Sequence, residues 1–137
     1  MRALLPILLL LGACASTDSG ARYAEPSTTE GRTVLGPQTL ETGECGLFGW
    51  DARGDFVFFA TEGRGLYAGD EVVTLQPRGE FPELEFEALS LELGPAEVMI
   101  EGRRYTSARV TETLDDGFTR LRPLTVIEAC QTDALAT

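Results

Sequence analysis

The sequence contains no histidine, no lysine and no asparagine, and all 11 of its basic residues are arginine. Without histidine there is no imidazole to act as a base near neutral pH, so Ser90 and Ser107 have no partner for a Ser-His-Asp triad. Without lysine there is no amine that could form a Schiff base. These absences exclude two common routes to covalent catalysis, and we predict no catalytic residue.

Positive charge is scarce overall. The 11 arginines stand against 22 acidic residues, which gives a formal net charge of −11. A nucleic-acid-binding protein presents a basic face, so the charge excludes that class. Acidity on this scale either keeps a protein soluble or supplies a docking surface for a cationic partner, and the sequence leaves both interpretations open.

Long hydrophobic runs are absent as well. The longest apolar run covers 3–11 and is interrupted by Pro6. A transmembrane helix needs about 20 apolar residues, so this run is too short to span a bilayer. It does match the hydrophobic region of a signal peptide, which is about 7–15 residues long.

The tetrapeptide Leu11-Gly12-Ala13-Cys14 directly follows, and it resembles the lipobox of bacterial lipoproteins. The resemblance implies transfer of a diacylglyceryl group to the Cys14 sulfur, cleavage after Ala13 and acylation of the new amino terminus. Because Ala15 rather than Asp follows the cysteine, it also implies an outer-membrane location facing the periplasm. The alternative is an ordinary secreted protein, cut at the same place, with a free Cys14 thiol.

Cysteine is sparse, and lipidation of Cys14 would leave only Cys45 and Cys130. An even pair in an exported protein predicts a disulfide. Closing the loop from Cys45 to Cys130 would stabilise the fold by roughly 4–5 kcal/mol in the loop-entropy model. Redox chemistry and metal ligation are the alternatives, although a redox pair normally lies two residues apart.

Composition divides the chain into four segments. We expect a signal peptide at 1–13, a lipidated cysteine and flexible tether at 14–32, a β domain at 33–132 and a disordered tail at 133–137. In the third segment, turn signals built from Gly, Pro and Asp recur about every 8–15 residues, which is typical of all-β proteins. The sequence therefore predicts a small antiparallel β-barrel or β-sandwich of about seven to nine strands.

Alternating apolar and polar residues predict individual strands. The run 56–61 is apolar on both faces and predicts a central strand, while Asp116-Gly117 predicts a two-residue hairpin turn. Pro123 indicates an edge position or a bulge in the last strand. The run 83–93 changes phase after Ala88, which predicts a bulged strand rather than the helix that its composition also permits. The remaining expected strands cover 46–50, 71–76, 97–100, 105–111 and 118–130.

Four side chains are candidates for a binding surface. Trp50 precedes a turn that contains Arg53, and Tyr67 and Tyr105 are the two tyrosines of the expected β domain. Most aromatic residues of a small β domain belong to its core, so a structural role is the alternative for Trp50, Tyr67 and Tyr105.

No motif indicates a cofactor or a metal. Asp115 and Asp116 adjoin each other beside a turn, whereas paired catalytic carboxylates face each other across a cleft. Their surroundings also lack the spacing of a calcium loop. The stretch Gly63-Arg64-Gly65 is too short for a phosphate loop.

These features together favour a non-enzymatic binding or assembly module, held by a lipid at the periplasmic face of the outer membrane, with an envelope protein as its partner. The expected architecture is similar to that of small lipoprotein inhibitors of lysozyme, and an acidic protein would suit a cationic lysozyme. The motif that this family carries between its cysteines is missing; Ser19 to Tyr23 resembles part of it but precedes Cys45. The sequence also leaves open a carboxylate-dependent hydrolase and a carrier of an apolar ligand.

Overall fold

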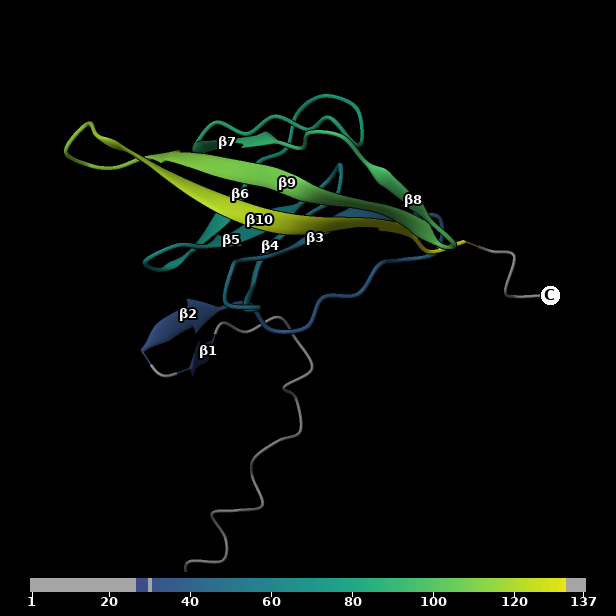
Figure 1. Ribbon diagram of the computed structural model, residues 1–137, viewed down its shortest axis with the longest axis horizontal. Coiled ribbons are helices and arrows are strands. Elements are labelled where there is room, and N and C mark those ends of the chain that lie inside the picture. The colour runs from purple at the N-terminus through teal and green to yellow at the C-terminus, as the bar shows by residue number, and fades with distance from the viewer. Residues whose placement is uncertain (1–26, 30, 133–137) are drawn as a thin grey trace, which may run out of the picture.

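The computed structural model describes residues 27–29 and 31–132 (Figure 1). The lipobox with Cys14, most of the expected tether and the expected tail lie outside the described residues. The described part is all-β and contains no α-helix, as the turn spacing predicts. It accordingly holds no helix of the length and apolarity that crossing a membrane requires.

Ten strands make up this part of the chain. Five of them begin and end within one residue of the runs that predict them. Their bounds are β1 (Ser27–Thr29), β2 (Arg32–Val34), β3 (Cys45–Trp50), β4 (Phe56–Ala60), β5 (Gly65–Ala68), β6 (Val72–Leu75), β7 (Leu89–Glu92), β8 (Glu97–Met99), β9 (Gly102–Thr113) and β10 (Thr119–Cys130).

Eight of the strands form one antiparallel sheet, which curls into a half-barrel. The strand order is β6-β5-β4-β3-β10-β9-β7, and β8 pairs with the other half of the long strand β9. β3 to β6 form a meander, and β10 then returns beside β3. Strands β1 and β2 form a separate hairpin. The predicted antiparallel all-β fold is thus confirmed as a half-barrel.

The pairing of β10 with β3 brings the two cysteines together. Cys130 lies opposite Cys45 in the antiparallel register, and the two sulfurs form a disulfide. In chain order, the bond joins the first strand of the large sheet, β3, to the last, β10. The predicted disulfide is therefore confirmed.

The long hairpin of β9 and β10 extends beyond the strand on its other side. β3 covers only Thr125–Cys130, so the segment 119–124 of β10 is paired with β9 alone. Pro123 lies in this segment, where its missing N–H faces no neighbouring strand. The turn is longer than predicted: Leu114 N donates to Phe118 O, which leaves three loop residues ending at Gly117 with φ +90°.

Core side chains pack on both faces of the curled sheet at β4. β4 is central, and its residues from Val57 to Ala60 are fully buried, as the apolar run predicts. Phe58 contacts Phe86 edge-on, with ring centroids 5.8 Å apart. Phe86 and Leu84 come from the segment 77–88, which crosses over the concave face (Figure 1). Side chains therefore occupy the interior that an apolar-ligand carrier would need.

The expected bulged strand over 83–93 is wrong in its first half. Only Leu89–Glu92 is a strand, and the preceding segment has one isolated β-bridge, between Arg78 and Glu85. Leu84 and Phe86 still alternate into the core, so the apolar pattern reported burial correctly. The pattern could not reveal that this segment covers a sheet instead of joining one.

Regular structure also begins earlier than the expected start at Thr33. Strand β1 and the first residue of β2 fall within the segment assigned to the tether. A contact with the β3–β4 turn fixes the hairpin, because Arg32 donates to both carboxylate oxygens of Asp55, at 2.6 and 3.2 Å. Composition alone does not report such a long-range ion pair. Strand β5, which follows a glycine-rich turn, is likewise missing from the predicted strands.

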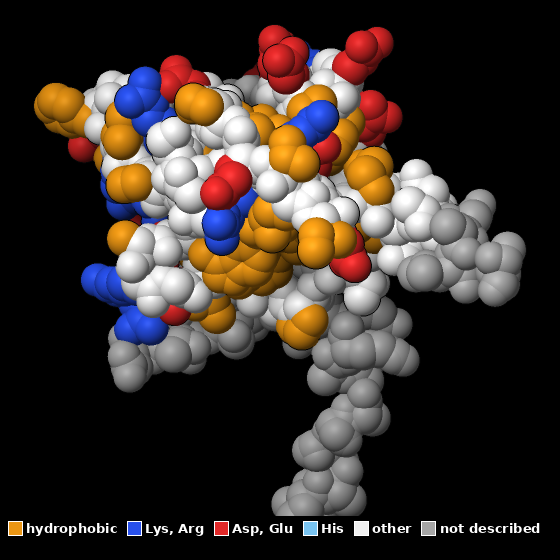
Figure 2. All heavy atoms as spheres, turned by 45° about the vertical axis from the view of Figure 1, so that its right-hand side comes forward, with side chains coloured by type: hydrophobic (Ala, Val, Ile, Leu, Met, Phe, Trp, Pro, Cys, Tyr) orange, Lys and Arg blue, Asp and Glu red, His pale blue; other side chains and the backbone are white. Residues whose placement is uncertain are grey.

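Charges of both signs cover much of the surface. Cross-strand ion pairs join Arg104 to Glu97 and Arg109 to Glu92 on exposed positions. Figure 2 shows acidic and basic side chains interspersed around a central hydrophobic area on one face. The excess of acidic residues therefore does not exclude locally basic sites.

Candidate functional site

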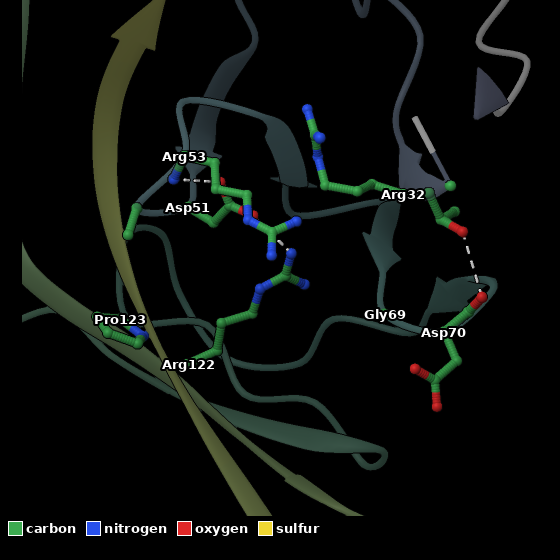
Figure 3. A pocket seen from close by; sticks show the side chains of 10 residues that line it. Arg32, Asp51, Arg53, Gly69, Asp70, Arg122 and Pro123 are labelled. Carbon is green, nitrogen blue, oxygen red and sulfur yellow. Dashed lines mark hydrogen bonds and ion pairs between the residues drawn. The ribbon is translucent and has the colours of Figure 1, made fainter. Parts of the chain in front are cut away.

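A pocket of about 420 Å³ opens at the end of the sheet where β10 extends beyond β3. Four segments surround it: the start of β2, the β3–β4 turn, the β5–β6 turn and β10 (Figure 3). The shorter strand β3 leaves this space beside β10. Its lining residues include Arg32, Asp51, Arg53, Asp70, Arg122 and Pro123.

Two arginines of β10 enter this end of the half-barrel because strand residues two apart face the same side. Arg120 lies opposite Glu112 of β9 and donates to both of its carboxylate oxygens, at 3.0 and 3.1 Å. Arg122, one step further along, points into the pocket. Tyr67 of β5 connects the two, since its hydroxyl donates to Glu112 at 2.8 Å and accepts from Arg122 at 3.2 Å.

Arg122 is held by further contacts on two other segments. Its Nη1 donates to the carbonyl oxygen of Ala68 at 2.8 Å, and its Nη2 donates to Asp51 Oδ2 at 2.7 Å. The other oxygen of Asp51 accepts the backbone amides of Arg53 and Asp55, which closes the β3–β4 turn. One carboxylate thus shapes the turn and fixes Arg122 beside it.

Arg53 projects into the pocket from the same turn (Figure 3). Gly54 follows with φ +88°, a conformation that tightens the turn and that other residues rarely adopt. The Arg53 side chain is exposed, and within residues 31–132 its guanidinium forms no ion pair. It is the least engaged cation of the pocket.

The protonation states around the pocket follow from these contacts. Burial works to raise the pKa of Asp51, but hydrogen bonds from Arg122 and two amides outweigh it and leave the pKa below its usual value. For Glu112 burial is again opposed, by hydrogen bonds from Arg120 and Tyr67, and the pKa is lowered. Burial, reinforced by Glu112, raises the pKa of Tyr67 to about 12.

Comparison with protein families, with curated proteins and with solved structures finds no match for this chain. The assignment of the site therefore depends on its own geometry. Within the part of the chain that the structure describes, no group of three acidic or cysteine side chains is placed to hold a metal ion.

The four predicted binding residues do not form one site. Arg53 lines the pocket, and buried Tyr67 supports it through Arg122. Trp50 is half-buried and packs on Phe56, with ring centroids 5.4 Å apart, outside the pocket lining. Tyr105 is buried, and its hydroxyl donates to Glu128 at 2.7 Å, away from the pocket. Trp50 and Tyr105 therefore have the structural contacts that most aromatic residues of a small β domain make.

Arg122, Asp51 and Arg32 were not predicted from the sequence as pocket residues. The spacing of Arg120 and Arg122 could have indicated that they lie on the same face of a strand, because strand residues two apart face the same side. Asp51 and Arg32 carry no such signal, since their partners lie far along the chain.

Proposed function

We propose that the protein is a non-enzymatic binding module, anchored through a lipidated Cys14 at the periplasmic face of the bacterial outer membrane. The pocket between β10 and the β3–β4 turn would be its recognition site. The proposed location depends on the lipobox resemblance of Leu11 to Cys14.

One observation carries the choice of binding over acid–base catalysis. Hydrogen bonds from Arg122 and Arg120 move the pKa values of Asp51 and Glu112 further below neutral pH, and burial moves the pKa of Tyr67 further above it. A general acid or base works best when its pKa lies near the operating pH. Asp51 in the pocket, and Glu112 behind Tyr67, are instead fixed charges that hold the arginines in place, which suits recognition of a ligand.

The test is affinity capture of the full-length protein from mildly cross-linked cells, with two matched variants. Arg53→Ala removes the pocket cation that has no carboxylate partner. Arg78→Ala is the control, because Arg78 is also exposed, forms no ion pair within residues 31–132 and lies outside the pocket. Both variants change the net charge equally, so they differ only in where the charge is lost.

We expect one partner to be recovered in near-equal amount with the wild type and with Arg78→Ala. Recovery should fall at least tenfold with Arg53→Ala. An identical set of proteins from all three samples would contradict the proposal that the pocket is the recognition site.

An inhibitor of a cationic lysozyme-like enzyme is a second candidate. The net charge of −11 favours it, because opposite net charges accelerate association. Inhibition of a cationic lysozyme by micromolar protein would support this candidate. Full lysozyme activity at that concentration would remove it.

A further inference from the structure

We infer that the pocket binds an anionic oxoacid group, a phosphate or a carboxylate, held by the guanidinium groups of Arg53 and Arg122. This inference rests on the proposed binding function and names the ligand class of the same pocket. Three observations support it: N–H groups of the two arginines lack partners within residues 31–132, the nearby carboxylates already have partners, and the pocket is large enough for a small molecule.

The arginine pattern singles out the pocket. Within residues 31–132, every arginine except Arg53 and Arg78 forms an ion pair with an Asp or Glu side chain. In a chain with twice as many acidic as basic residues, an arginine that faces a pocket without a carboxylate partner is unusual. Arg53 therefore offers its whole fork of donors to a ligand.

Arg122 retains donors of its own. A guanidinium carries five N–H groups, and the contacts of Arg122 within the described residues are two through Nη1 and one through Nη2. The Nε–H and one Nη2–H remain. Since Arg53 and Arg122 come from different segments, each can donate to a different oxygen of one oxoanion, and such charge-assisted hydrogen bonds are stronger than neutral ones.

The two acidic residues of the lining do not cancel this attraction. Asp51 already accepts three hydrogen bonds, from Arg122 and from two backbone amides. The Asp70 side chain is 82 % exposed and forms its ion pair with Arg120. Figure 3 shows its carboxylate directed away from Arg53 and Arg122. A ligand anion between the two arginines would thus not meet an unpaired carboxylate.

The volume indicates a ligand larger than the oxoanion itself. At about 420 Å³, the pocket falls within the roughly 300–1,000 Å³ that small-molecule sites occupy. Gly31 and Gly69 contribute to its walls. The anionic group would anchor a molecule whose remainder fills the rest of the space.

The test is an NMR titration of the full chain in a neutral detergent, using inorganic phosphate and acetate as probes. Sodium chloride at matched ionic strength measures the effect of screening. The reporters are the Arg122 side-chain Nε–H and the Gly69 amide, which remain present in every variant. Wild type, Arg53→Ala and Arg78→Ala are compared.

We expect saturable shifts with phosphate or acetate but not with chloride, at least tenfold weaker binding in Arg53→Ala and unchanged binding in Arg78→Ala. Equal affinity in Arg53→Ala, or a response to both probes no different from that to chloride, would overturn the inference. This failure is distinct from failure of the proposed function, because capture that still depends on Arg53 would retain the binding module and reject only the ligand class.

A vesicle arm distinguishes a lipid headgroup from a free ligand. The Cys14→Ser chain is sedimented with phosphatidylcholine vesicles that contain or lack phosphatidic acid. Binding that requires phosphatidic acid and Arg53 would support a phosphate on a lipid. If phosphate binds in the titration without such sedimentation, the inference holds for a free ligand.

Discussion

Arg122 should contribute more to stability than any exposed arginine, because its ion pair with Asp51 is largely buried. Arg122→Met keeps an aliphatic stem of similar length but removes the hydrogen bonds to Asp51, Tyr67 and Ala68. The Asp51 side chain, only 9 % exposed, would then lose its ion-pair partner. Breaking a buried pair in this way costs about 3–5 kcal/mol. Because the Arg122 side chain is 26 % exposed, we expect a smaller loss, about 2–3 kcal/mol.

Urea unfolding with the disulfide intact measures this loss as a lower midpoint. The control is Arg109→Met, because the exposed pair of Arg109 with Glu92 should contribute less than about 1 kcal/mol. Equal midpoints for the two variants would refute the reasoning that burial makes the Arg122 pair the stronger one.

Arg122→Met should also change how the free energy of unfolding depends on pH in the acidic range. The folded-state pKa of Asp51 is lowered, so its ion pair stabilises the protein above the unfolded pKa of about 3.9, and this stability is lost as the pH falls through the folded value. Without Arg122, only the two backbone amides still oppose the effect of burial, so the pKa of Asp51 rises. As the pH falls, Arg122→Met should therefore begin to lose stability at a higher pH than the wild type. An unchanged onset would contradict the proposed effect of Arg122 on the pKa of Asp51.

Three further predictions follow from the fold and the sequence. Cys45→Ser opens the link to Cys130 and should lower the free energy of unfolding by up to about 4–5 kcal/mol, seen as a reduced Tm; an unchanged Tm would show that the link adds nothing. Gly102→Ala should destabilise the protein by more than about 1 kcal/mol in urea, because a Cβ there would overlap the carbonyl oxygen of Glu128; wild-type stability would mean that the strands separate easily at this point. Cys14→Ser should move the protein from the membrane fraction to the soluble fraction, and continued membrane retention would refute lipid anchoring.

The fold was more predictable from the sequence than the site. Period-two alternation and regular turn signals reported the all-β class, the buried strand 56–60 and the disulfide, because each depends on local pattern or on composition. The segment 83–88 misled the prediction, since an irregular chain lying over a sheet can present Leu84 and Phe86 to the core with the same alternation as a strand.

The pocket could not be predicted as a unit. It depends on the offset between β10 and β3, which leaves Pro123 and Arg122 beside an open space, and no local pattern reports such an offset. Its polar contacts also join residues distant in sequence, such as Arg122 and Asp51. The sequence could indicate Arg53 as an exposed turn residue, but only the tertiary structure places it near a second arginine.

The fixed charges at this end of the half-barrel can be tested by a ¹³C NMR titration of the Asp51 and Glu112 side-chain carboxyl groups in the full chain. Both groups should titrate below the usual pKa values for Asp and Glu, because hydrogen bonds from arginine and its neighbours outweigh burial at each. The pocket would then carry fixed charges suited to binding. A midpoint near neutral pH at either carboxyl would contradict this claim and favour an acid–base role for the site.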